Sequence, residues 1–407
     1  MARPPLSKAW DFLRVVFAGG GTGGHIMAGL AVAEGIKARY PQAEICFVST
    51  GNALEERCLE GKGYKFFKTK ARAWKGSLIG MTMFLISFVV SFLRCLWYWR
   101  ELKPDVVFGL GGYASLVPVI CAYIRRVPVL LLEQNVVPGK ATRFLAPWAD
   151  LVLCHWTASE RWLSCGERLR FTGTPLREGL FGRQPTTPPQ ADQSASGGIA
   201  GLGGKAPTLL VLGGSQGARA INDAMVEGLP LLKEMVPGLR VIHSTGKEGY
   251  ARVKGAYERL GMEDGVFDFL VDMGAAYSSA DLVLSRAGAT TLAEITAWGL
   301  PAVLIPYPHS ADGHQYSNAE ELAARGAAVV VKERDLTAQG LTELLLGVLT
   351  DGERLQGMRR ASRAMGKPSA TQEVIQCMLE LLEGGRRLDR GHQKGERVCQ
   401  SLSPQAL

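Results

Sequence analysis

The sequence predicts an α/β protein built from two doubly wound, Rossmann-like domains that face a cleft. The chain contains two openings of the type strand, glycine loop, helix. The first is LRVVFAGGGTGGH from Leu13 to His25, with a helical stretch to about Arg39, and the second is TLLVLGGSQG from Thr208 to Gly217. Between them, residues 184–205 are rich in Pro, Thr, Gln, Ser and Gly, a composition typical of a linker.

Short β-branched runs alternate with helical segments after each opening, and this alternation predicts parallel sheets flanked by helices. We expect a first domain over residues 1–180, a linker over 181–206 and a second domain over 207–370. Residues 371–407 are expected to form a helix that packs back on the first domain, then a disordered tail beyond about Gly385. The runs are Ile45–Val48, Val106–Gly109, Val127–Leu132 and Leu151–Cys154, then Val241–Ser244, Leu282–Ser285, Ala302–Pro306 and Ala328–Lys332.

Composition narrows the class of protein. The 407 residues suit two domains, and 47% hydrophobic with 21% charged residues is typical of a globular chain. The net charge of +8 favours an anionic partner, but Lys and Arg are spread along the chain, which argues against nucleic acid. The eight cysteines form no CxxC pair, so we expect neither a zinc site nor disulfides. With no signal-peptide-like run at the N-terminus, the sequence predicts a cytosolic protein.

One apolar segment departs from the alternating pattern. Residues 77–93 carry no charge, and the apolar run continues past Arg94 to Trp99. Basic residues flank it on both sides, from Lys68 onward and up to Lys103. Such a helix is typical of one that lies in the interface of an anionic membrane. The alternatives are a buried core helix and a membrane span, although the run is short for a span.

The first glycine loop satisfies GxGxxG with Gly19, Gly21 and Gly24. Dinucleotide sites of this type also need an acid at the end of the second strand, and here that strand ends in Ser49-Thr50-Gly51-Asn52. A dehydrogenase is therefore disfavoured. The loop still allows close approach of an anion or sugar, and His25 on the first helical turn is the candidate base, with a helix-capping role as the alternative.

Two further loops can hold phosphate. In the second opening, glycines allow close approach and Ser215 offers a hydroxyl, although an ordinary strand–helix turn has the same composition. In the stretch Ser285–Glu294, a turn at Gly288 precedes a helix whose N-terminus favours a diphosphate without a metal. Glu294 lies where it can accept both hydroxyls of a ribose; the alternative is a solvent-facing residue near the helix start.

Polar, glycine-rich clusters follow several other strands, and ligands of open α/β sheets bind beyond the carboxyl ends of strands. No Asp-x-Asp pair stands at a strand end, so we expect no metal-chelated diphosphate. The clusters are Gly109–Tyr113, Glu133–Asn135, Gly173–Arg177 and Pro306–Gln315.

In chain order, the motifs GGTGGH, GGY, EQN, GGSQGA, AGATTLAE and HQ resemble those of the MurG family of bacterial transferases, in glycosyltransferase family 28. The resemblance covers about Val15 to Ala370, apart from the linker. It implies the GT-B fold, with the donor bound mainly by the second domain and a lipid acceptor by the first. It also implies inverting, cofactor-free transfer of N-acetylglucosamine from UDP-GlcNAc to the C4 hydroxyl of the muramyl sugar of lipid I (undecaprenyl-pyrophosphoryl-MurNAc-pentapeptide), which gives lipid II for peptidoglycan.

The same resemblance implies roles for individual residues. His25 matches a histidine proposed to assist catalysis, and Glu294 would take the ribose hydroxyls while the backbone of Leu270 contacts uracil. Gln315, with His314, would contact the sugar hydroxyls. The diphosphate would be bound by Ser215, Arg177 and the loop of Ala289, Thr290, Thr291, Leu292 and Ala293, and Thr22, Gly23, Gly24 and Asn135 would close the cleft from the first domain.

The resemblance further implies a peripheral protein on the cytoplasmic face of the bacterial membrane, touching anionic lipid through residues 68–100. Other cell-wall synthesis proteins are implied as partners, and nucleic acid is not. Ala28 stands where the family commonly has Pro, Thr174 replaces a common Asn, the linker is longer than usual, and the His309–Gln315 loop follows one of the family's versions. The rival functions are transfer to another lipid, such as diacylglycerol, and a catalytically silent sugar-nucleotide-binding module.

Overall fold

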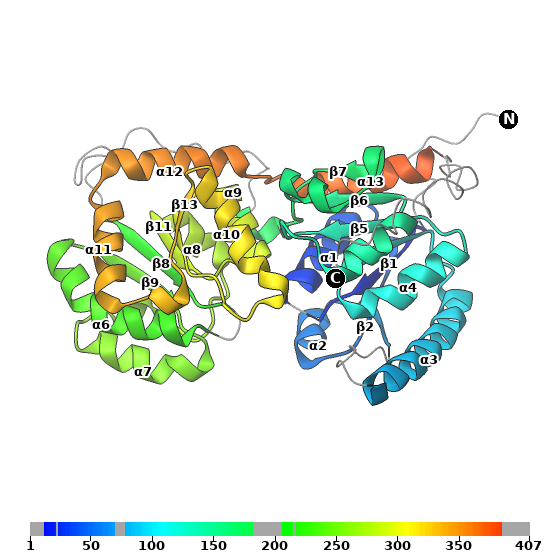
Figure 1. Ribbon diagram of the computed structural model, residues 1–407, viewed down its shortest axis with the longest axis horizontal. Coiled ribbons are helices and arrows are strands. Elements are labelled where there is room, and N and C mark those ends of the chain that lie inside the picture. Colours follow the sequence, from blue (N-terminus) through cyan, green and yellow to red (C-terminus); the bar gives the residue numbers. More distant parts are fainter. Residues whose placement is uncertain (1–11, 22, 70–77, 182–205, 215–216, 385–407) are drawn as a thin grey trace.

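The computed structural model describes residues 12–21, 23–69, 78–181, 206–214 and 217–384. Two parallel sheets, each covered by helices, form two bodies that lie side by side (Figure 1). The first sheet has seven strands in the order β3-β2-β1-β4-β5-β6-β7, and the second has six in the order β10-β9-β8-β11-β12-β13. In the first sheet, β2 and β3 follow on one side of β1, and the later strands follow on its other side. The strands around β8 have the same arrangement in the second sheet. Each sheet is therefore doubly wound, as the sequence predicts.

The elements of the first sheet and its helices follow one another in βα order up to residue 181. The strands are β1 (Arg14–Gly19), β2 (Glu44–Ser49), β3 (Lys65–Lys68), β4 (Val106–Gly111), β5 (Val129–Glu133), β6 (Leu151–Cys154) and β7 (Leu169–Arg170). The α-helices are α1 (Gly23–Arg39), α2 (Ala53–Leu59), α3 (Leu78–Leu102), α4 (Tyr113–Ile124) and α5 (Lys140–Leu145).

The second sheet repeats this pattern. Its strands are β8 (Thr208–Leu212), β9 (Arg240–Ser244), β10 (Val266–Phe267), β11 (Leu282–Ser285), β12 (Ala302–Leu304) and β13 (Ala328–Val330). The α-helices are α6 (Arg219–Met235), α7 (Lys247–Glu258), α8 (Met273–Ser279), α9 (Ala289–Trp298), α10 (His314–Ala324), α11 (Ala338–Leu349), α12 (Gly352–Met365) and α13 (Ala370–Glu383).

All strands expected from β-branched runs are present, but three edge strands were not predicted. These are β3, β7 and β10, with four, two and two residues. A two-residue strand is too short to show any periodicity, and each of the three pairs with only one neighbour. The central strands are apolar on both faces because helices cover both sides, as the fully buried pattern of β4 illustrates.

Helix α13 returns from the second body to the first (Figure 1). Its side chains Val374, Ile375, Met378 and Leu379 are buried in the same hydrophobic cluster as α1 and β1. Where the chain leaves the first body, the Leu176 N–H donates to Thr371 Oγ1 at 3.0 Å, and Thr371 Oγ1 donates to the Leu176 carbonyl at 2.7 Å. The outgoing and returning segments are thus joined to each other by two hydrogen bonds.

Helix α3 lies on the outer side of the first body (Figure 1). One face, with Cys95, Tyr98, Trp99 and Leu102, is buried in the core. The opposite face exposes six large apolar side chains: Met83, Ile86, Val89, Val90, Leu93 and Trp97. This exposure contradicts the alternative of a wholly buried core helix. Arg94 and Arg100 are exposed on the same helix. Within the described ranges, no helix combines the length and apolar character that crossing a membrane requires.

Candidate functional site at the ends of the two sheets

The first glycine loop lies where strand order reverses in the first sheet. It follows β1, and its Gly20 N–H donates to the Gly111 carbonyl at the end of β4, at 3.3 Å. His25, on the first turn of α1, is only partly buried, and its Nδ1 lies 3.1 Å from the Gly20 carbonyl oxygen. Gly111 lies against the ring, since a Cβ there would come 3.3 Å from His25 Nε2. The imidazole is therefore held at the carboxyl ends of β1 and β4; Thr22 lies outside the described residues.

The second sheet brings the start of α9 to the same place. Helix α9 follows β11, and its N-cap is Gly288, which offers no side-chain cap to the first N–H groups of the helix. These groups belong to the predicted diphosphate loop of Ala289, Thr290, Thr291, Leu292 and Ala293, of which Leu292 and Ala293 are buried. The positive end of a helix left uncapped in this way is a binding site for an anion.

The two bodies meet closely at Gly24. A Cβ at this glycine would lie 2.9 Å from Thr290 Oγ1 of the second body and 3.8 Å from Gln134 Oε1 of the first. Thr290 Oγ1 and Gln134 Nε2 are both buried and find no hydrogen-bond partner among the residues that the structure describes. Buried polar atoms normally have a hydrogen-bond partner, so these two groups beside Gly24 are available to bind a polar molecule.

Glu294 lies one turn into α9 and is partly buried, which favours the site role over the alternative of a solvent-facing residue. The buried Tyr277 hydroxyl of α8 donates to its Oε2 at 2.9 Å. Burial raises the pKa of the Glu294 carboxyl, while the Tyr277 hydrogen bond and the charge of Arg177 act in the opposite direction. Arg177 is exposed, and its positive charge also acts on the Cys58 thiol of the first body, where it opposes the rise in pKa that burial causes.

Gln315 is held by backbone groups. Its Oε1 accepts from the N–H of Tyr307 at 2.9 Å and from that of Ala287 at 3.2 Å. The carboxamide is thereby oriented, and its Nε2 amide is directed away from these two donors. Beside it, His314 Nδ1 is buried and has no hydrogen-bond partner in the described part of the chain. Both residues start α10, so they present donors at the same sheet edge as α9.

Asn135 joins the two bodies. Its Nδ2 donates to Glu133 Oε1 at 3.1 Å, and its Oδ1 accepts from Asn318 Nδ2 of α10, also at 3.1 Å. The wholly buried Asn318 further accepts the N–H of Val136 at 2.9 Å. The Asn135 side chain thus holds α10 against the loop that follows β5. The sequence did not reveal this structural role.

The remaining predicted residues lie in two other places. Leu270 follows the edge strand β10 and lines a largely apolar groove of about 780 Å³ that continues along α8 toward Ala275 and Ala276. Tyr277, on the same helix, links this wall to Glu294. After β8, the Gly217 N–H donates to the Gly214 carbonyl at 3.0 Å, and Ser215 lies outside the described residues. Gly23 opens α1 beside Gly24.

The clusters of acidic, histidine and cysteine side chains that could hold a metal ion are absent from the described ranges. Three site residues were missed from the sequence: Glu55, Tyr277 and Asn318. For Glu55 a signal existed, because Asn52-x-x-Glu55 is a capping box, but a capping box alone indicates only a helix start. For Tyr277 and Asn318 there was none, since each meets its partner only through packing of distant segments.

Comparison with known proteins gives matches along most of the chain. Residues 15–154 match the glycosyltransferase family 28 N-terminal domain, and residues 208–374 match the C-terminal domain of that family. A UDP-N-acetylglucosamine–N-acetylmuramyl-(pentapeptide) pyrophosphoryl-undecaprenol N-acetylglucosamine transferase of Syntrophotalea carbinolica is 38% identical over 365 residues, covering 89% of this chain and 97% of the relative. The transferase of the same name from Thermodesulfovibrio yellowstonii is 38% identical over 386 residues, covering 92% and 100%. The crystal structure of MurG from Acinetobacter baumannii matches with a TM-score of 0.71 at 27% identity, over 91% of this chain and 99% of that one.

Proposed function

Because the chain belongs to glycosyltransferase family 28, we propose that it transfers N-acetylglucosamine from UDP-GlcNAc to the C4 hydroxyl of the muramyl sugar of lipid I, forming lipid II. The observation that carries the proposal is the meeting at Gly24, where the loop of one sheet faces the uncapped start of α9 from the other. Thr290 Oγ1 and Gln134 Nε2, which have no hydrogen-bond partner among the described residues, belong to that meeting point and are suited to a sugar nucleotide.

In this proposal the second body binds the donor. Glu294, oriented by Tyr277, accepts the ribose hydroxyls, and the Leu270 backbone contacts uracil. The first N–H groups of α9, with Arg177 and Ser215, bind the diphosphate and stabilise the charge that develops on the leaving UDP. The Gln315 carboxamide, oriented by its two backbone donors, donates from Nε2 to a sugar hydroxyl.

The first body supplies the acceptor and the base. His25 removes the proton of the attacking hydroxyl, which then displaces UDP from the opposite face of the anomeric carbon with inversion. Its Nδ1 faces a carbonyl, which can only accept, so Nδ1 carries the hydrogen and Nε2 is the basic nitrogen. Gly23, Gly24, Thr22 and the Asn135 region close the cleft over the donor.

We further propose that the chain works at the cytoplasmic face of the bacterial membrane. The support is the exposed apolar face of α3 with Arg94 and Arg100, which suits the interface of an anionic leaflet where lipid I resides. Contacts with other cell-wall synthesis proteins belong to the same proposal.

The test is transfer of radiolabelled N-acetylglucosamine from UDP-GlcNAc to a short-chain lipid I analogue, with EDTA present. Wild type should form the lipid II analogue, and His25→Ala should be slower by roughly 10²- to 10⁴-fold, the usual contribution of a general base. If wild type binds UDP-GlcNAc but forms no product from lipid I, the acceptor is another lipid; diacylglycerol is then tested in the same assay.

A further inference from the structure

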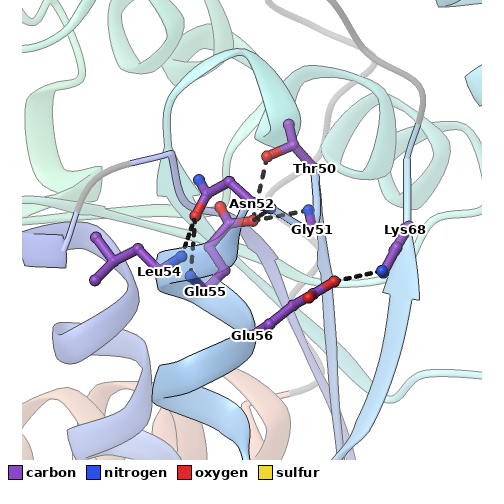
Figure 2. A network of polar contacts seen from close by, with 7 residues as sticks. All are labelled: Thr50, Gly51, Asn52, Leu54, Glu55, Glu56 and Lys68. Carbon is purple, nitrogen blue, oxygen red and sulfur yellow. Dashed lines mark hydrogen bonds and ion pairs between the residues drawn. The ribbon is translucent and has the colours of Figure 1, made fainter.

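Glu55 is a buried carboxylate that lies behind the first glycine loop, on the first turn of α2. Its side chain is 0% exposed and is surrounded by donors from two loops. Oε1 accepts from the Gly21 N–H and from Ser49 Oγ, each at 2.6 Å. Oε2 accepts from the N–H groups of Gly51 at 2.8 Å and Asn52 at 3.1 Å and from Thr50 Oγ1 at 3.2 Å (Figure 2). Five groups therefore surround one buried carboxyl group, and three of them are backbone N–H groups that can only donate.

Only one of these five bonds leads toward the cleft. Gly51, Asn52 and Thr50 belong to the α2 capping box and its turn, which explains why a carboxylate is needed there at all. The Gly21 N–H does not belong to that turn; it lies 34 residues earlier, in the loop that precedes α1. The bond between Gly21 and Glu55 therefore ties the cleft loop to a rigid helix end.

The Gly21 N–H and the Gly20 carbonyl are the two ends of a single planar peptide group. Glu55 Oε1 accepts from one end at 2.6 Å, and His25 Nδ1 lies 3.1 Å from the oxygen at the other end. Because the peptide is planar, fixing its N–H fixes the direction of its carbonyl. The result is a line of hydrogen bonds from the carboxylate through one peptide group to the imidazole.

The close approach of Glu55 also explains why a glycine precedes this peptide bond. A Cβ on Gly20 would lie 2.3 Å from Glu55 Oε1 and 2.7 Å from Ser49 Oγ, and Gly20 has a φ of 151°. Any side chain at this position would push the carboxylate away from the Gly21 N–H. Gly20 and Glu55 are thus matched to each other sterically as well as by hydrogen bonding.

We propose that Glu55 is a positioning residue for sugar transfer, which acts through the Gly20–Gly21 peptide to hold the His25 ring with its hydrogen on Nδ1 and its basic lone pair on Nε2. The inference rests on the proposed role of His25 as base. A carboxylate that accepts from a peptide N–H increases the negative charge on the carbonyl oxygen of the same peptide, because hydrogen bonds in a chain polarise one another. The line therefore also stabilises the imidazolium that forms when His25 takes the hydroxyl proton.

Nitrogen-15 NMR of the His25 ring in the full-length wild-type protein tests the geometry without any variant. The neutral imidazole should be present as the Nδ1–H tautomer. A ring found as the Nε2–H tautomer would overturn the proposal, even if the transfer assay gave lipid II. The measurement also stands if wild type proves inactive on lipid I, so failure of the proposed function and failure of the positioning role are told apart.

Glu55→Gln tests the consequence for catalysis. A carboxamide presents an NH₂ group to donors that need an acceptor, so the Gly20–Gly21 peptide loses its anchor. We expect kcat to fall roughly 10-fold, less than the whole 10²- to 10⁴-fold contribution of a general base, with the KM for UDP-GlcNAc changed less than about twofold. Glu56→Gln is the matched control, because the neighbouring carboxylate pairs with Lys68 at the surface (Figure 2). It forms no side-chain hydrogen bond with the described residues of the glycine loop, so its kcat should equal that of wild type.

Two further variants separate positioning from a general loss of structure. Ser49→Ala removes a donor from the same carboxylate oxygen but leaves the Gly21 bond, so it should keep kcat within about threefold of wild type, whatever its stability. If Glu55 acts through His25, Glu55→Gln should cause no further loss in a His25→Ala background. Equal losses in Ser49→Ala and Glu55→Gln, or a full additional 10-fold loss in the double variant, would refute the proposal.

Discussion

Acidification should destabilise this protein through two buried histidines, one in each body. His155 and His243 are 6% and 0% exposed, and burial lowers the pKa of each from 6.5 to about 3. The hydrogen bonds suit the neutral rings: His155 Nδ1 accepts from the Thr174 N–H at 2.9 Å, and His243 bonds Tyr257 Oη at 2.9 Å and Asn222 Oδ1 at 3.0 Å. Neither ring can take a second proton without placing a charge in the core.

The sign and size of this pH effect follow from the difference in histidine pKa between the folded and unfolded states. Because the folded pKa is depressed, the stability contribution of each ring is fully present above pH 6.5 and is lost progressively as the pH falls toward 3. At about pH 5 the unfolded chain has taken up a proton on each ring and the folded chain has not, which costs about 2 kcal/mol per histidine. The raised pKa of Glu294 acts in the opposite sense, since its protonation in the folded state adds stability as the pH falls.

Comparison of His243→Gln with wild type isolates one of these contributions. Urea unfolding followed by circular dichroism at about pH 7.5 and about pH 5 should show a loss of unfolding free energy on acidification that is smaller in the variant by about 2 kcal/mol. His309→Gln, at an exposed position of the second body, is the control and should lose as much as wild type. Equal losses in wild type and His243→Gln would refute the reasoning.

Three other predictions concern the site and the membrane face. Tyr277→Phe removes the hydroxyl that orients Glu294, so the KM for UDP-GlcNAc should rise about 10-fold with kcat nearly unchanged, as measured by initial rates; an unaltered KM would contradict the ribose role. Gly24→Ala places a Cβ 2.9 Å from Thr290 Oγ1, so sugar transfer should fall at least about 10-fold while calorimetry still detects UDP binding. Equal loss of transfer and of UDP binding would mean that the two bodies do not meet at Gly24 during transfer. Leu93→Asp, on the exposed face of α3, should weaken co-sedimentation with anionic vesicles at least about 10-fold. Its free energy of unfolding should change by less than about 0.5 kcal/mol. Unchanged vesicle binding would exclude this face from the membrane contact.

The sequence alone predicted the two sheets because their central strands carry local signals. Buried parallel strands are continuous β-branched runs, and the glycine loops after β1 and β8 mark the positions where a backbone must approach a ligand closely. The same local logic located His25 on the first turn of α1 and Glu294 one turn into α9. Sequence patterns could not predict β7 and β10, because a two-residue strand is too short to show a repeating pattern of apolar residues. They also left open whether α3 is buried or lies on a membrane, because both alternatives require an apolar helix.

Contacts between distant segments were decided by the tertiary structure. The sequence places Gly24 and Thr290 far apart, and nothing in either motif indicates that one packs on the other. In the sequence, Asn52-x-x-Glu55 is only a capping-box pattern, and the fold brings the Gly21 N–H to the carboxylate oxygen that does not face this box. The physical reason is that local conformation depends on neighbouring side chains and backbone preferences, whereas the partner of a buried polar group depends on how whole sheets and helices pack. The residue types at the site were therefore determined by the sequence, and their orientation by how the loops and helices of the two bodies pack.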